Sequence, residues 1–117
     1  MVKKGEIFYT SWGYDQTNYD YIVVLEISPS GKTAMCQRAL HENVGFSCGA
    51  NKQKPIPKGF GDKFRMQIKK AMIMGGDYLR GSYPFCHDGS MRHKRLDSFF
   101  KATEGEIFQE TDSQWGH

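Results

Sequence analysis

Tyr19-Asp20-Tyr21-Ile22-Val23-Val24-Leu25-Glu26-Ile27-Ser28 is the stretch that decides the fold of this chain. Aromatic and β-branched residues dominate it, and such residues favour a strand. The next four residues are Pro29, Ser30, Gly31 and Lys32, a composition typical of a tight turn, in which proline suits the second position. We therefore predict a strand over 19–28 that ends in a hairpin turn at 29–32.

The segments on either side of this strand continue the same pattern. Residues 6–12 (Glu-Ile-Phe-Tyr-Thr-Ser-Trp) are aromatic and β-branched, and the turn residues of 13–18 join them to the central strand. Residues 33–41 follow the hairpin turn and are expected to return as a third strand. The first third of the chain thus predicts a β-meander, three strands joined by short turns.

Further along the chain, apolar and polar residues alternate over Phe64–Lys70, which favours a strand, although a helix over 62–74 is the rival interpretation. Residues 77–83 predict another short strand, and 96–102 a strand or a single helical turn. Glycine, proline and lysine are frequent in 43–62, which we expect to be an irregular loop. The residues from 103 to 117 are expected to form an acidic tail.

These elements predict a mostly β fold in one domain spanning residues 1–117. Many short strands separated by glycine and proline turns are typical of a small twisted sheet or an SH3-like barrel, with room for one short helix. The chain has no apolar run near 18 residues, so no membrane span is expected. Three cysteines without paired spacing, and a beginning without an apolar secretory core, favour free thiols in a cytoplasmic protein.

Charge is segregated along the chain. Residues 1–51 sum to −1 (four Lys and Arg against five Asp and Glu), 52–95 to +8 (eleven against three) and 96–117 to −4 (one against five). A concentration of positive charge is where a polyanion binds. A solvated basic face that keeps a small protein soluble, or one that binds a protein, is the alternative interpretation.

If the basic segment folds as expected, its cations contact a nucleic-acid backbone, DNA or RNA, and nearby aromatic rings stack on unpaired bases. The predicted phosphate contacts are Lys63, Arg65, Lys69, Lys70, Arg92, Lys94 and Arg95. The predicted stacking groups are Tyr78 and Tyr83. The proposal requires that 63–70 and 92–95, which are far apart in the sequence, lie on one surface of the folded protein.

The opening sequence Tyr9-Thr10-Ser11-Trp12-Gly13-Tyr14-Asp15-Gln16-Thr17-Asn18, with an aromatic and valine-rich strand after it, resembles that of a family of small proteins carried by phages and plasmids. The ending Trp115-Gly116-His117 is similar to that of the same family. The resemblance covers residues 5–25 best and implies a mobile-element origin, but it brings no family activity with it.

Small proteins of mobile elements often block host defence nucleases, so the resemblance also suggests an alternative function. In it the chain is an anti-CRISPR-like inhibitor that binds a host nucleic-acid-processing protein. The residues expected to make that contact are aromatic residues of the opening hairpin and carboxylates of the tail: Trp12, Tyr14, Glu104, Glu106, Glu110 and Asp112.

Catalytic and metal-binding motifs are weak by comparison. The paired spacing of structural zinc ligands is missing among Cys48, Cys86, His87 and His93. The adjacent residues Cys86-His87-Asp88 are better interpreted as a loop than as a catalytic triad, whose members are seldom adjacent in sequence. Gly31-Lys32-Thr33 lacks the upstream glycines of a phosphate-binding loop. We expect neither an enzyme nor a bound metal or cofactor, with a small hydrolase or a zinc protein as a third alternative.

Overall fold

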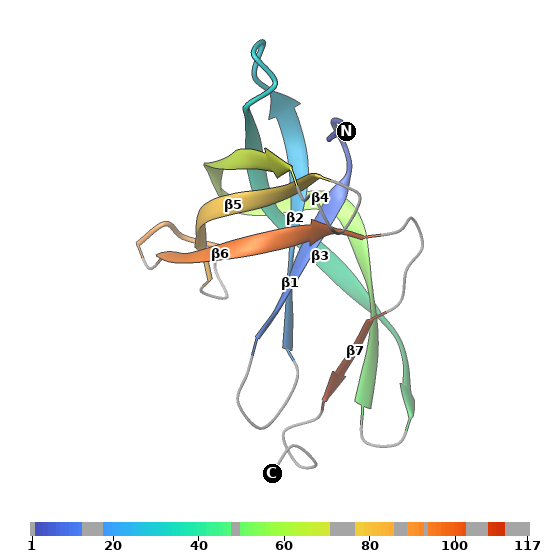
Figure 1. Cartoon of the computed structure of the whole chain (residues 1–117). Helices are drawn as coiled ribbons and strands as arrows, with labels where there is room; N and C mark the ends of the chain where they lie inside the picture. Colours follow the sequence, from blue (N-terminus) through green and yellow to red (C-terminus); the bar gives the residue numbers. More distant parts are fainter. Residues whose placement is uncertain are drawn as a thin grey trace.

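Seven strands make up the described part of the chain in a computed structural model (Figure 1). The described residues are 2–12, 18–47, 50–70, 77–85, 89–92, 94–102 and 108–111. The strands are β1 (Ile7–Trp12), β2 (Asn18–Ile27), β3 (Thr33–Ser47), β4 (Ala50–Lys70), β5 (Asp77–Pro84), β6 (Lys94–Lys101) and β7 (Phe108–Thr111). The described residues contain no helix, so the mostly β prediction is confirmed.

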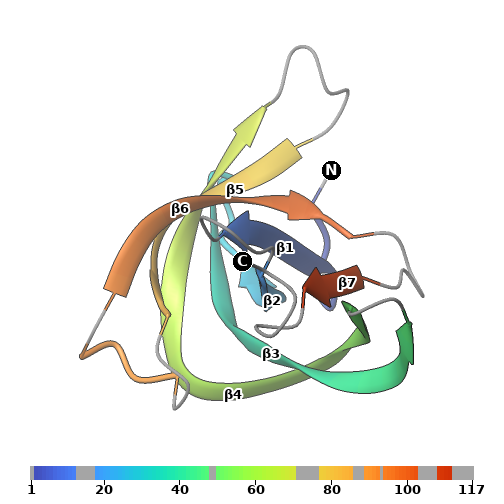
Figure 2. The same ribbon diagram turned by 90° about the horizontal axis from the view of Figure 1, so that it is seen from below.

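Six of these strands form a closed antiparallel barrel. Their order is β3-β2-β1-β6-β5-β4, and pairing between β3 and β4 closes the ring, as the view along the barrel shows (Figure 2). Three register shifts interrupt the β3–β4 pairing, and bulges of this kind bend strands strongly enough to wrap a sheet on itself. The architecture is compatible with the small SH3-like barrel expected from the sequence.

The barrel interior is filled by alternate residues of the six barrel strands. Phe8, Ile22, Cys36, Met66 and Phe99 are among the buried members of this core. The residues between them point outward, because successive side chains of a strand face opposite sides of the sheet. This alternation fixes which residues of the basic segment reach solvent.

The long apolar run of β2 is buried on both faces. Ile22 and Val24 face the barrel core, and Tyr21 and Val23 belong to a second buried cluster on the outside of β1 and β2. Phe108 of β7 completes that outer cluster. Its ring centroid lies 4.7 Å from that of Tyr9 and 5.3 Å from that of Tyr21.

Strand β7 therefore has a structural role that the sequence did not predict. It pairs with residues 50–53 of β4 and brings Phe108 over the outer face of β1 and β2. The expectation of a tail from residue 103 onward is wrong for 108–111. The carboxylates of that segment indicated a solvated tail, but the burial of Phe108 holds 108–111 against the barrel.

The expected irregular loop over 43–62 is also wrong, because β3 and β4 run through all but residues 48–49 of it as a long hairpin. The three register shifts of the β3–β4 pairing all involve residues of this segment. Pro55 and Pro57 lie in β4 between the residues that pair with β7 (50–53) and those that pair with β5 (67–70). There, among the described residues, β4 has a strand partner on one edge only, which is β3. A strand tolerates residues without an N–H group at such an edge.

The remaining local predictions agree with the structure. Residues 64–70 form a strand rather than a helix, 77–84 and 94–101 are strands, and the 29–32 turn closes with a 2.9 Å hydrogen bond from the Gly31 amide to the Ser28 carbonyl. The expected turn at 13–17 lies outside the described residues.

Candidate functional site

The outer face of β4, β5 and β6 carries five of the exposed cations of the basic segment. Met66 of β4, Leu79 of β5 and Phe99 of β6 are fully buried in the barrel, so the residues that alternate with them face outward. In Figure 1 the end of β4, then β5, then β6 lie one below the other. We call this surface the β4–β6 face. Its outward residues are Lys63, Arg65, Gln67, Lys69, Tyr78, Arg80, Ser82, Lys94, Leu96, Ser98 and Phe100.

The strand register arranges these residues in rows across the three strands. Gln67, Arg80 and Ser98 form one row, and the Arg80 guanidinium donates a 2.7 Å hydrogen bond to the Ser98 hydroxyl. Lys69 lies opposite Tyr78 in the next row. Ser82 lies opposite Leu96 in the row on the other side.

Five of the outward residues are cations and none is a carboxylate. Lys63, Arg65 and Lys69 come from β4, and Arg80 and Lys94 come from β5 and β6; all five side chains are exposed. None of them forms an ion pair with another residue that the structure describes. Unpaired cations of one sign on one surface produce a positive potential that extends into solvent.

Apolar side chains lie among these cations. Leu96 is 59% exposed and Phe100 is 38% exposed. The Phe100 ring lies beside that of Tyr78, with centroids 5.8 Å apart and planes inclined by 32°. Arg65, Lys69, Arg80 and Leu96 also line a shallow hollow of about 460 Å³ in the middle of the face.

The two basic stretches of the sequence do converge, though not through every predicted residue. Lys63, Arg65 and Lys69 share the face with Lys94. Arg92 is exposed in a turn that packs beside β4, because the neighbouring Met91 amide donates a 2.9 Å hydrogen bond to the Asp62 carboxylate. Lys70 is exposed but lies on the other face of β4.

Arg95 is not available as a phosphate contact in the way the sequence suggested. It alternates with Lys94 and so points to the inner side of β6, where its guanidinium lies 3.0 Å from the Asp97 carboxylate. It also donates a 3.1 Å hydrogen bond to the Tyr83 hydroxyl. Pairing with a carboxylate reduces the positive potential that Arg95 contributes outside the protein.

Tyr83 was predicted to stack on bases, and this prediction is wrong. Its side chain is fully buried, and its hydroxyl donates a 2.6 Å hydrogen bond to the Asp20 carboxylate. Arg38 donates a 2.9 Å hydrogen bond to the same carboxylate and a 2.7 Å bond to the Pro84 carbonyl. Burial, together with the Asp20 charge, raises the pKa of Tyr83 far above its ordinary value. The residue is therefore part of a buried polar network.

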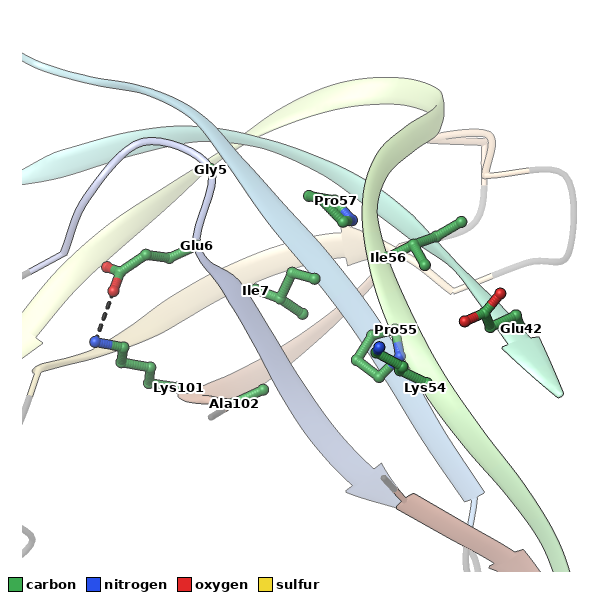
Figure 3. A pocket seen from close by; sticks show the side chains of 10 residues that line it. All are labelled: Gly5, Glu6, Ile7, Glu42, Lys54, Pro55, Ile56, Pro57, Lys101 and Ala102. Atoms are coloured by element: carbon green, nitrogen blue, oxygen red, sulfur yellow. Dashed lines mark ion pairs between the residues drawn. The ribbon is translucent and has the colours of Figure 1, made fainter. Parts of the chain in front are cut away.

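A second hollow lies on another side of the molecule, between the start of β1, the end of β6 and the amino-terminal part of β4 (Figure 3). Its volume is about 910 Å³. Ile7, Ile56 and Ala102 supply apolar lining, and Glu6 and Lys101 form an ion pair of 2.6 Å at its side. No cysteine, histidine, serine or threonine of the described residues is among its lining residues, so its geometry suggests no catalytic nucleophile of those types.

Several sequence predictions fall outside the described residues. These are Tyr14, Glu104, Glu106 and Asp112, the side chains of Trp12 and Glu110, and the zinc candidates Cys48, Cys86, His87 and His93. Within the described residues, no three His, Cys, Asp or Glu side chains are placed to hold a metal ion. The anti-CRISPR-like alternative therefore stays a prediction.

No protein-family model, curated protein or solved structure matches this chain in comparisons of sequence and fold. The resemblance to phage and plasmid proteins likewise stays a prediction. In the described part of the structure there is no helix with the length and hydropathy needed to cross a membrane.

Arg80, Leu96 and Phe100 belong to the face but were not among the binding residues predicted from the sequence, and neither were Gln67, Ser82 and Ser98. Arg80 was counted in the basic segment, but nothing indicated that it would lie between the two clusters. Phe100 and Leu96 lie in the segment 96–102, for which the sequence predicted a strand or a single helical turn but no binding role. Their exposure follows from the position of Phe99, which occupies the barrel interior and leaves its alternating neighbours outside.

Proposed function

We propose that this protein binds nucleic acid without catalysing a reaction, and that the β4–β6 face contacts the phosphate backbone. The observation that carries the proposal is the set of five exposed cations on three adjacent strands, with no carboxylate among the outward residues. Lysine and arginine neutralise phosphates and release condensed counterions, which supplies most of the affinity of non-specific binding.

The arrangement of the five cations supports this proposal over a merely solvated surface. Acidic residues near the face are directed elsewhere: the Asp97 carboxylate pairs with Arg95, and the Asp62 carboxylate accepts a hydrogen bond from the Met91 amide. A surface selected only for solubility gains from interspersed charges of both signs. The absence of carboxylates from the face instead favours a partner of opposite charge. We place the protein in a mobile element that handles its own or its host's nucleic acid.

Binding of a fluorescent oligonucleotide at low salt, followed by anisotropy, tests the proposal. The variant Arg65→Ala/Arg80→Ala removes two cations from the face, and Lys3→Ala/Lys4→Ala removes two exposed cations outside these strands. We expect the first variant to lose at least about tenfold in affinity and the second to retain wild-type affinity within about twofold, because only the first removes backbone contacts.

Absence of binding by the wild-type protein at low salt would contradict the proposal. So would an equal loss in the two variants, since that result would mean that net charge acts without a defined surface.

A further inference from the structure

The β4–β6 face combines its cations with a pair of aromatic rings, the exposed Phe100 and the half-buried Tyr78. Tyr78 and Phe100 come from adjacent strands, their ring centroids lie 5.8 Å apart, and the Tyr9 ring lies 6.5 Å from Phe100. The barrel core is on the opposite side of these strands, so neither Tyr78 nor Phe100 contributes to its packing. A pair of rings that is partly open to solvent at such a position suits a ligand that itself has flat apolar faces.

Cations surround this pair. Lys69 lies directly opposite Tyr78, and Arg80 is two residues further along β5. Arg65 and Leu96 line the hollow next to them. The row of outward cations on β4, from Lys63 to Lys69, is about 20 Å long, because it spans six residues at about 3.3 Å each. Charged and stacking groups are thus within reach of a short piece of one chain.

These two features together distinguish a single strand from a duplex. A duplex presents phosphates on its outside while its bases are stacked within, so it uses the cations but leaves the rings unused. A single strand presents phosphates and unpaired base faces together, and stacking on protein aromatic residues is a common mode of binding it.

We infer that the ligand of the β4–β6 face is single-stranded nucleic acid, whose bases stack on Tyr78 and Phe100 while the five cations of the face, Arg65, Lys69 and Arg80 among them, contact its phosphates. This inference rests on the proposed function and adds the strandedness of the ligand to it. The rings bind bases and the cations bind phosphates, so substitutions of the two kinds of residue should change the affinity for nucleic acid in different ways.

The test compares the affinity for oligothymidylate of about 16 nucleotides with that for a duplex of equal length, at one salt concentration. Oligouridylate of the same length is a third arm, which separates DNA from RNA. Tyr78→Leu/Phe100→Leu removes the rings but keeps apolar side chains and all charges. Phe85→Leu is the matched control, because Phe85 is also exposed (43%) but lies after β5, outside the face.

We expect the wild-type protein to prefer one or both single strands over the duplex. The double variant should lose at least about fivefold in affinity for the single strand, the lower limit for loss of one stacked base, and keep its affinity for the duplex. The control should behave as the wild-type protein does. Phe100→Leu alone should show part of the loss if the double variant unfolds.

Equal affinity for both forms, with no effect of the ring substitutions, would overturn the inference while the proposed function stands. Failure of every oligonucleotide to bind would overturn both.

Discussion

Tyr83 is held in place by charged groups on several sides, although its ring lies in an apolar core. The Asp20 carboxylate accepts hydrogen bonds from the Tyr83 hydroxyl and from Arg38, and Arg95 donates a further hydrogen bond to the same hydroxyl. The guanidinium carbons of Arg38 and Arg95 also lie 5.8 Å and 5.7 Å from the Tyr83 ring centroid. A buried network of this kind is stable only when its members remain paired.

Replacing Tyr83 by Phe tests the importance of this network. The change removes one donor from the buried Asp20 carboxylate and should lower the free energy of unfolding by about 1–3 kcal/mol, measured by urea denaturation. Tyr78→Phe is the control, because the Tyr78 hydroxyl has no hydrogen-bond partner among the described residues; it should change stability by less than about 0.5 kcal/mol. Equal stability of the two variants would contradict this view of Tyr83.

Cys36 illustrates a different consequence of burial. Its thiol is in the barrel core, where desolvation raises its pKa from 9.0 to about 12. The folded state therefore keeps a proton that the unfolded state releases between pH 9 and 12. This group's contribution to stability is complete below pH 9 and is lost as the pH rises through that range.

The reactivity of Cys36 with iodoacetamide follows from the same shift, because the thiolate is the nucleophile. In a protein carrying Cys48→Ser and Cys86→Ser, alkylation at pH 9 should be about five hundred times slower in the native state than in urea. Mass spectrometry of timed samples measures both rates. Similar rates in the two conditions would show that the thiol is not buried as described.

At the scale of elements, β4 organises the molecule. It pairs with β3 along most of its length, with β7 near its start and with β5 near its end. Residues 89–92 pack against its middle, where the Asp62 amide donates a 2.8 Å hydrogen bond to the Gly89 carbonyl. Gly61 permits this approach: its φ is +75°, and a Cβ atom there would lie 2.5 Å from the Gly89 oxygen.

Two glycine substitutions separate backbone strain from steric conflict. Gly31 has nearly the same φ, +72°, but a Cβ atom there would meet nothing within 4 Å. Gly31→Ala should therefore cost about 1 kcal/mol from its left-handed conformation alone. Gly61→Ala carries the same strain plus a clash with backbone and should lose at least about 1 kcal/mol more, measured as free energies of unfolding in urea. Equal losses would mean that residues 89–92 do not pack on β4.

The elements differ in how well the sequence predicts them, for physical reasons. The strand over 19–28 was predictable because its apolar residues and its turn are both local signals. The long β3–β4 hairpin was not, because Pro55, Pro57 and several glycines of 43–62 signal a loop unless their place at bulges and at a partly unpaired edge is known. For β7, the signal was one apolar pair, Ile107 and Phe108, among carboxylates.

For the whole molecule, the charge pattern of the sequence predicted part of the candidate site. The convergence of Lys63, Arg65 and Lys69 with Lys94 follows from the barrel order, which places β5 between β4 and β6. Tyr83 and Arg95 point inward because of the strand register. The register could not be predicted from the sequence, because it depends on which residues fill the barrel core. A charge sum carries no information on which face a residue occupies.

The dependence of binding on salt tests most directly the claim that the β4–β6 face contacts phosphates. For a single strand the slope of log Kobs against log salt concentration is about −0.7 for each phosphate contact, so five contacts predict about −3.5. Arg65→Ala/Arg80→Ala should bring the slope to about −2.1, while Lys3→Ala/Lys4→Ala should leave it unchanged. A slope near zero in the wild-type protein, or one that the first pair of substitutions does not alter, would contradict the claim.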